Sequence, residues 1–478
     1  MAASVVSTEL KLHRRHGVFA GTAAMAVGWS LVLLAVPSGL RPAALPWVLF
    51  LEVTALGFFF LPALAVVERA HGVTAALRLT GLRPLLALSV RLGILVAGAL
   101  AASAPLMAVS RTGGASVIAG VALTALLFGL TALVMVGRAG TLTAFLSRAP
   151  LVAIPLLTPA LLHAAGVSNS VLLHLSPATA GWRLLAGEAS APSVGWLLVG
   201  VAALWAGATR IGFDVLPAPP APSRGLRGPA LRLRPQGTAL RSVRSFAVVD
   251  LRTLLGDRIL LLLVGGIPLI VLVLGWVTGP GIGWIERRYG FDFTPHVPAL
   301  QAFVLAAHIP VIFGALTALL FLEDRDAGLM PAVAATPAGV TTLVAYRLTA
   351  AAVVTALAVG ASMASGAGHP AGWIGVLATA IAAGGVATVP AAALAALAGD
   401  RVQGMAMMKA ISLPIYLPVA WWFVDGPAGW ILALVPTGPA SQALWAPDPL
   451  RAAGFAAASG VISAAWVAWL LPRLLRDY

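Results

Sequence analysis

The sequence predicts an all-α polytopic membrane protein with about 12 transmembrane helices, arranged as two parallel six-helix repeats. Three observations predict this fold class. Hydrophobic residues make up 60% of the 478 positions and charged residues only 10%, with a mean hydropathy of +0.97. Long apolar runs follow one another along nearly the whole chain. Residues 68–92 match residues 324–348 without a gap, which indicates an internal duplication.

Each predicted span is an apolar run long enough to cross the bilayer core, which takes about 20 helical residues. In the first half the predicted spans cover residues 17–36, 44–67, 84–108, 115–137, 149–165 and 192–212. In the second half they cover residues 258–278, 298–322, 340–364, 371–397, 407–424 and 452–472. The first run is expected to be a retained span and not a signal peptide, because no convincing cleavage site follows it.

The distribution of basic residues predicts the topology. With six spans in each half, about 24 of the 30 basic residues fall on one side of the membrane and about six on the other. By the positive-inside rule the rich side is cytoplasmic, and it carries both termini. The net charge of +14 therefore reflects topology and not nucleic-acid binding. Abundant alanine and scarce lysine suggest a bacterial protein, so we expect the bacterial cytoplasmic (inner) membrane.

Residues 213–245 are rich in proline and arginine, which is typical of a linker. They separate a first six-helix half, residues 1–212, from a second, residues 246–478. Each half begins with an amphipathic basic segment that is expected to lie in the membrane interface. Residues 167–188 and 425–448 are too polar and proline-rich to span. We expect short helices that dip into the outer leaflet or, alternatively, ordinary outer loops.

The sequence contains no motif for catalysis or for holding a cofactor. It has no GxxxxGK[ST] phosphate-binding loop, so the chain itself is not expected to hydrolyse ATP. The eight histidines show no metal-ligand spacing, and the absence of cysteine excludes disulfides and thiolate metal sites. We therefore expect that the chain is not an enzyme and carries no metal or cofactor of its own.

The two matching stretches are predicted to be cytoplasmic elbows between the second and third spans of each half. Each elbow is about 16 residues long, far more than two helices need to connect. Their recurrence favours contact points with a partner protein over interfacial helices without a partner. The candidate coupling residues are Glu68, Arg69, Gly72, Thr80, Arg83, Glu323, Asp324, Arg325, Asp326, Gly328, Thr336 and Pro337. Arg91 and Arg347 also occupy matching positions.

Ionisable side chains within spans are costly and are usually functional. Glu52 in the second span and His308 in the eighth occupy matching positions, so we expect both to contact substrate at a similar depth. Alternatively, Glu52 contacts water at the outer end of its helix and His308 only hydrogen-bonds a neighbouring helix. Phe59 and Trp421 are candidates to line a hydrophobic path or, alternatively, to pack against lipid and neighbouring helices.

Several motifs of the second half occur together and in order. They are DLRTLLGDR at 250–258, YGFDFTP at 289–295, LFLEDRDAGLMPAVAATP at 320–337, YRL at 346–348 and GDRVQGMAMMKAISLPIYLP at 399–418. With these motifs the second half resembles the permease subunits of ABC type-2 exporters, and among them it is most similar to permeases described as fluoroquinolone exporters. The first half resembles the family more loosely and lacks the acidic cluster of Glu323, Asp324 and Asp326.

The resemblance implies that each elbow forms a coupling helix seated on a cytoplasmic ABC ATPase subunit, which binds ATP and Mg²⁺. Residues 68–83 and 323–339 would then contact two ATPase copies. The expected substrate is a hydrophobic or amphipathic drug, antibiotic or lipid that is moved outward. The alternative is a proton-coupled secondary multidrug transporter of major-facilitator-like topology. Against it, the Gly-Asp-Arg loop expected after the second span is missing and membrane-embedded carboxylates are few.

Overall fold

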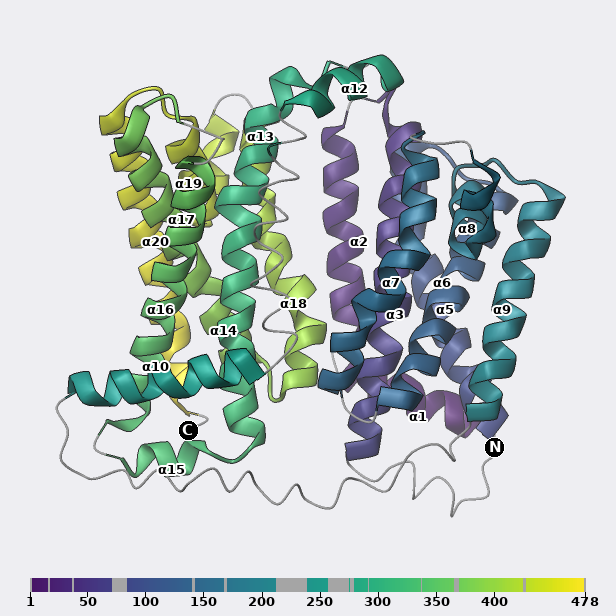
Figure 1. Ribbon diagram of the computed structural model, residues 1–478, viewed down its shortest axis with the longest axis horizontal. Coiled ribbons are helices and arrows are strands. Elements are labelled where there is room, and N and C mark those ends of the chain that lie inside the picture. The colour runs from purple at the N-terminus through teal and green to yellow at the C-terminus, as the bar shows by residue number, and fades with distance from the viewer. Residues whose placement is uncertain are drawn as a thin grey trace. The chain divides into compact units, whose positions relative to one another are not determined.

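In the computed structural model, the regular secondary structure of the described residues is entirely helical (Figure 1). The structure describes residues 2–15, 18–36, 38–70, 84–139, 142–166, 170–211, 239–256, 275, 279–290, 292–336, 338–364, 369–423 and 427–476. The chain divides into two compact units, Met1–Leu231 and Arg232–Tyr478. Each unit has its own bundle of helices.

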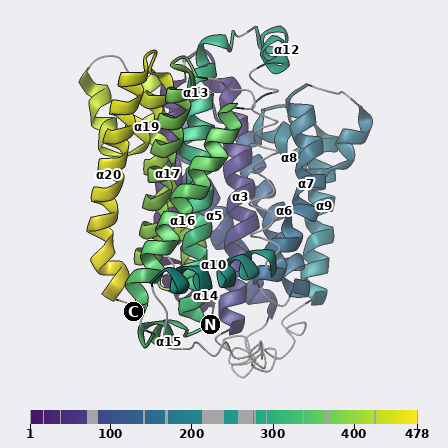
Figure 2. The same ribbon diagram turned by 60° about the vertical axis from the view of Figure 1, so that its left-hand side comes forward.

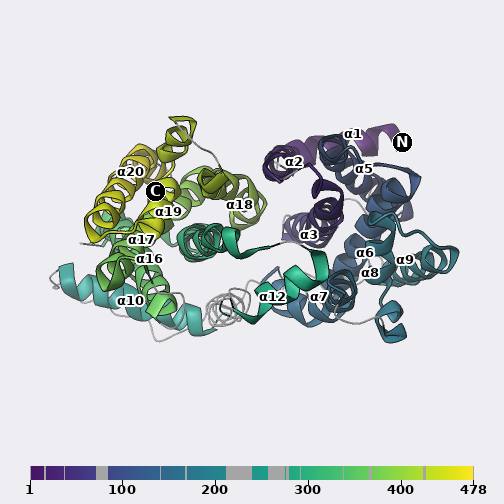
Figure 3. The same cartoon turned by 90° about the horizontal axis from the view of Figure 1, so that it is seen from above.

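The first unit is organised around one long apolar helix. Its helices are α1 (Ala2–Arg15), α2 (Val18–Ala35), α3 (Arg41–Ala70), α5 (Pro84–Ser110), α6 (Ala115–Ala139), α7 (Leu142–Ala164), η1 (Val171–Leu175), α8 (Pro177–Leu185) and α9 (Ala191–Ile211). α6 packs against α3, α5, α7, α8 and α9, and α2 packs against α3 and α5. α1 lies across the ends of α2 and α5 (Figure 3). Long helices suit these sequences because a helix satisfies its backbone hydrogen bonds internally, as hydrocarbon surroundings require.

The second unit is organised around α17. Its helices are α10 (Ala239–Gly256), α12 (Pro280–Tyr289), η3 (Thr294–His296), α13 (Val297–Ala302), η4 (Phe303–His308), α14 (Ile309–Asp326), α15 (Met330–Ala334), α16 (Gly339–Ser362), α17 (Gly372–Leu397), α18 (Arg401–Tyr416), η6 (Leu417–Phe423), η7 (Pro427–Leu434), α19 (Thr437–Trp445) and α20 (Pro449–Arg476). α14, α16, α18, α19 and α20 pack against α17. α10 packs against α16 and lies crosswise to α14 and α16 (Figure 2).

The helices coincide with the predicted spans, except that the span at 258–278 lies almost wholly outside the described residues. Seven helices among the described residues are long and apolar enough to cross a membrane, and three shorter apolar helices accompany them. The protein is an all-α polytopic membrane protein. α10 begins at Ala239, inside the segment predicted as linker, because residues 239–245 continue its amphipathic pattern.

The described parts of the two units begin and end with similar elements. Each begins with an amphipathic helix, α1 or α10, and each has two short helical segments before its last long helix. These segments, η1 with α8 and η7 with α19, fall at the two proline-bearing patches of the sequence. Most of α8 and α19 is buried against neighbouring helices. α8 and α19 are thus covered by protein, whereas η1 has no buried residue and η7 exposes Trp430 and Ile431.

The close contact between α14 and α17 depends on Gly314. A Cβ atom at this position would lie 2.5 Å from both the Ala387 carbonyl oxygen and Pro390 Cγ. We expect Gly314→Ala to destabilise the purified chain by about 1–3 kcal/mol, because the helices would have to separate. Thermal unfolding in detergent measures this change.

Gly460 on α20 provides the matched control. A Cβ atom there meets nothing within 4 Å. Because alanine favours a helix more than glycine does, Gly460→Ala is expected to stabilise the chain by up to about 1 kcal/mol. Equal melting temperatures for the two variants would contradict the close α14–α17 packing.

Candidate functional site

The second elbow begins where α14 ends, and a glycine sets that end. Gly328 has a left-handed backbone with φ of 65°. Its N–H donates to the Arg325 carbonyl, and the Leu329 N–H donates to the Asp324 carbonyl, both at 2.9 Å. This pair of bonds is a Schellman motif, which closes a helix and favours glycine because a side chain would strain the left-handed conformation. The chain then enters α15.

Arg325 holds the elbow against the end of α17. Its Nη1 donates to the Ala398 carbonyl at 2.6 Å, and its Nη2 donates to the Ala395 carbonyl at 3.0 Å. Carbonyl groups at a helix C-terminus lack partners within the helix and carry the negative end of its dipole. A guanidinium group donates hydrogen bonds to these carbonyl groups, and its positive charge is favourable at the negative end of the dipole. Arg325 therefore links α14 to α17 within the second unit.

Arg347 on α16 is the centre of a buried charge cluster. Its Nε donates to Asp250 Oδ2 at 3.0 Å and its Nη2 to Asp250 Oδ1 at 2.7 Å. The same Nη2 lies 2.8 Å from Asp324 Oδ2. Its guanidinium carbon also lies 5.0 Å from the centre of the Phe321 ring. We name Arg347, Asp250 and Asp324 the arginine hub.

The arginine hub joins three helices at the elbow end of the unit. Asp250 belongs to α10, Asp324 to α14 and Arg347 to α16. The bidentate contact fixes the distance and the orientation of the Arg347 guanidinium relative to the Asp250 carboxylate. Both side chains are almost fully buried. The arginine hub thus ties the end of α14 to α10 and α16.

α15 presents an apolar surface outward. Met330 is buried and packs in a cluster with Phe321 and Leu343, and Val333 packs partly against it. The residues on either side of Met330 and Val333 are exposed. We name this exposed set the elbow face, and it comprises Leu329, Pro331, Ala332, Ala334 and Ala335.

The other predicted coupling residues of the second elbow have separate positions. Asp326 is exposed and Glu323 is half-buried on the last turn of α14. Thr336 donates its hydroxyl to the Val333 carbonyl at 2.7 Å, which closes the turn after α15. Pro337 lies outside the described residues. Of the acidic cluster, Asp326 is therefore the member exposed to a partner, while Asp324 serves the arginine hub.

The first elbow is largely outside the described residues. Gly72, Thr80 and Arg83 fall there, and the side chains of Glu68 and Arg69, at the end of α3, are also outside the description. Their predicted roles stay predictions.

The first unit nevertheless repeats the buried ion pair. Arg91, which matches Arg347 in sequence, donates its Nε to Glu9 Oε1 at 2.8 Å, and both residues are buried. Glu9 lies on α1 and Asp250 on α10. Each amphipathic helix is therefore fastened to the third span of its unit by the same kind of bond.

Glu9 and Asp250 are not among the residues predicted from the sequence as partners of these arginines. A signal is present in the chain, because both acids belong to an acid-Leu-base tripeptide, ELK at 9–11 and DLR at 250–252. The partners lie 82 and 97 residues apart along the chain. A hydropathy pattern does not show which side chains meet when they are this far apart in the sequence.

His308 lies in a small aromatic cluster of the second unit. It ends the π-helical turn η4, and its Nδ1 lies 2.9 Å from the Tyr416 hydroxyl oxygen, within hydrogen-bond distance. The Phe303 ring stacks on the imidazole with centroids 5.7 Å apart. His308 thus lies within hydrogen-bond distance of a neighbouring helix, and its contact with substrate stays a prediction. π-Helical turns occur often at functional sites, and this one places the imidazole beside α18.

Tyr416→Phe tests the link between His308 and α18. The substitution keeps the ring and removes the hydroxyl, so we expect stability to fall by about 1 kcal/mol. Thermal unfolding of the purified chain measures the loss, with Tyr346→Phe as a control at a tyrosine outside the cluster. A Tyr416→Phe variant as stable as the parent would show that the hydrogen bond does not contribute to the stability of the chain.

Glu52 is buried in the first unit. Trp29 Nε1 donates to its Oε2 at 3.2 Å, and Oε1 has no partner among the described residues. Only 2% of the residue is exposed, so the expected contact with water at the outer end of α3 is wrong for this structure. α2, which carries Trp29, packs against α3 beside it.

Of the two aromatic candidates, the structure describes the side chain of Trp421 only. The Phe59 side chain is outside the description. Trp421 lies on η6 and packs edge-on against Trp430 of η7, with centroids 5.3 Å apart. A role for either residue in a substrate path stays a prediction.

Comparisons with known proteins bear on the second unit. The model of the family described as "Fluoroquinolones export permease protein Rv2686c-like" matches residues 250–471. Two relatives from Mycobacterium tuberculosis strains, the fluoroquinolones export permease proteins MT2760 and Rv2686c, are each 34% identical to this chain over 216 residues. The aligned part covers 43% of this chain and 82% of each relative. The matched residues include Asp250, the second elbow and Arg347, and the chain belongs to the Rv2686c-like family of export permeases.

Proposed function

We propose that the chain is the membrane permease of an ATP-driven exporter and that a separate ABC ATPase subunit supplies the energy. The observation that carries this proposal is the second elbow. It presents an exposed apolar face on α15, and the arginine hub and Arg325 fasten that face to α10, α16 and α17. A surface built in this way receives force from a partner and passes it to the transmembrane helices.

The elbow face has the composition of a protein contact. Its exposed leucine, proline and alanines are grouped, with Asp326 exposed one turn earlier on α14. A small apolar patch with a charged rim is common where partner proteins dock. ATP and Mg²⁺ would be bound by the partner, so nucleotide chemistry takes place outside this chain.

The duplication supports one chain acting as a complete permease pair. Because 216 residues make up 82% of each relative, each relative is about as long as one unit of this chain. The elbow that recurs in the sequence and the buried ion pair that recurs in the structure support this pairing. One chain would therefore carry two ATPase copies, one on each elbow.

We further propose that both termini and both elbows face the cytoplasm of a bacterium and that the chain lies in its inner membrane. The excess of basic residues on that side supports this orientation. The names of the relatives suggest fluoroquinolones as one substrate class, and more generally we propose hydrophobic or amphipathic compounds. Outward movement would follow as ATP-driven closure of the partner dimer draws the elbows together.

The experiment is purification of the full chain from its native membrane, followed by identification of retained proteins. The proposal expects an ATPase with a phosphate-binding loop at about two copies per chain. Recovery of the active chain without any such subunit, with uptake into inside-out vesicles that is lost on collapse of the proton gradient, would favour a secondary transporter.

A further inference from the structure

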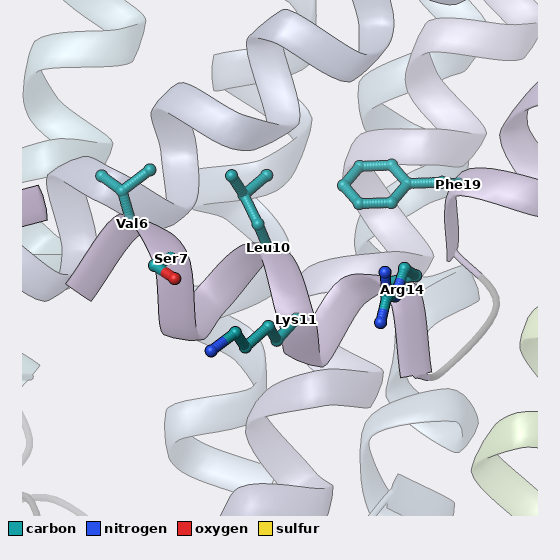
Figure 4. Close-up of a pocket in the computed structure, with 6 residues that line it drawn as sticks. All are labelled: Val6, Ser7, Leu10, Lys11, Arg14 and Phe19. Carbon is teal, nitrogen blue, oxygen red and sulfur yellow. The ribbon is translucent and has the colours of Figure 1, made fainter. Parts of the chain in front are cut away.

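We infer that α1 and the start of α2 form a binding site for an anionic phospholipid of the cytoplasmic leaflet. A groove of about 600 Å³ runs along the outer side of α1 and is lined by Val6, Ser7, Leu10, Lys11, Arg14 and Phe19 (Figure 4). Its size lies within the range of about 300–1,000 Å³ that is usual for ligand sites. The site rests on the proposed orientation and is independent of ATP coupling.

On α1 the buried face carries polar side chains and the exposed face carries apolar ones, the reverse of a helix on the surface of a soluble protein. Glu9 and His13 face inward and are buried, and Glu9 pairs with Arg91. Val6 and Leu10 face outward, with 36% and 41% of their surfaces exposed. Since aliphatic side chains gain from leaving water, this outward face is suited to hydrocarbon.

Two cations, Lys11 and Arg14, line the same groove as this apolar strip. In Figure 4, Val6, Leu10 and Phe19 project to one side of α1, whereas the polar tips of Ser7, Lys11 and Arg14 lie on the other side. Acyl chains would pack along the apolar strip, and the head-group phosphate would lie between the two cations. Long basic side chains with apolar stems commonly extend to head groups in this way.

The second unit supplies independent support. On α10, Asp250 faces inward to Arg347, while Val248, Leu251 and Leu255 are exposed. Arg244 and Arg252 are exposed on the same helix. The tripeptides at 9–11 and 250–252 thus have the same arrangement. In each, the acidic residue is buried and paired with an arginine, and the leucine and the basic residue are exposed. Two helices with this arrangement indicate a common setting, the boundary between acyl chains and anionic head groups.

The test uses the natural absence of cysteine. Ser7→Cys, labelled with bimane in the otherwise cysteine-free full chain, reports from within the groove. Spin-labelled phosphatidylglycerol and spin-labelled phosphatidylcholine are then titrated into nanodiscs as quenchers. We expect an apparent affinity on the order of tenfold greater for phosphatidylglycerol, because each basic group near the surface favours anionic lipid. A label at Leu450→Cys, exposed at the far end of the second unit, should show no preference.

Charge variants separate the groove from general attraction. Lys11→Ala/Arg14→Ala should abolish the preference at the Ser7→Cys label, whereas Arg287→Ala/Arg451→Ala, which removes the same charge elsewhere, should preserve it. Native mass spectrometry of the unlabelled chain provides a second readout of retained phosphatidylglycerol. Equal quenching by the two lipids, or an unchanged preference in the Lys11→Ala/Arg14→Ala variant, would overturn the site. Absence of quenching by both lipids would instead indicate that the groove lies outside the membrane, and would overturn it too.

Discussion

Arg347→Ala is expected to destabilise the chain more than any other single substitution of a charged residue described above. Asp250 would be left buried without its partner, and removal of one member of a buried pair typically costs about 3–5 kcal/mol. The measurement is the melting temperature of the detergent-purified chain together with its yield from membranes. We expect a large fall in both.

Two controls identify the cause of this effect. Arg451 forms an ion pair with Asp448, but 72% of its side chain is exposed, so Arg451→Ala should change stability by less than about 0.5 kcal/mol. The double variant Asp250→Leu/Arg347→Leu should be more stable than Arg347→Leu alone, because it leaves no uncompensated carboxylate on α10. A double variant as unstable as the single one would show that packing of the arginine stem, and not charge pairing, holds α10.

Leu329→Asp is expected to abolish coupling without unfolding the chain. Leu329 is 48% exposed and is the largest side chain of the elbow face, so a charge there costs the free chain little. At a docked apolar contact it would be buried without a partner. A loss of about 2 kcal/mol, the size expected for a residue on which an interface depends, would lower partner affinity about 30-fold. Co-purification with the ATPase and drug-stimulated ATP hydrolysis both measure the loss.

Leu450→Asp is the matched control for Leu329→Asp. Leu450 is an exposed leucine of the same unit, at the start of α20 and away from the elbow. Its substitution should leave partner binding unchanged. If Leu329→Asp retained full binding and stimulated hydrolysis, the elbow face would have no part in docking.

The spans and the elbows were predictable from sequence because they depend on local composition. An apolar run such as 371–397 has only one stable arrangement in a bilayer, and the structure has a helix over Gly372–Leu397. The second elbow was found because it recurs at 68–92. The sequence did not show why a glycine stands at position 328. The structure shows that Gly328 ends α14 with a left-handed backbone.

The roles of individual charges were less predictable. Arg325 and Asp324 were both predicted to contact the ATPase, but their side chains bond to α17 and α16 within the unit. Which way a charged side chain turns depends on tertiary neighbours, and Arg325 turns to carbonyls some 70 residues later in the chain. The structure thus gives both residues a positioning role within the unit, and their contact with the ATPase stays a prediction beside the proposed elbow face.

ATP-dependent export by the purified complex tests the proposed function most directly. The full chain and its co-purified ATPase are reconstituted in proteoliposomes with a fluorescent fluoroquinolone, and accumulation is followed on adding ATP and Mg²⁺ from outside. We expect accumulation that requires ATP hydrolysis, persists with an uncoupler that collapses the proton gradient, and is lost in Leu329→Asp. Accumulation driven by a proton gradient without ATP, and unaffected by Leu329→Asp, would contradict an ATP-driven permease.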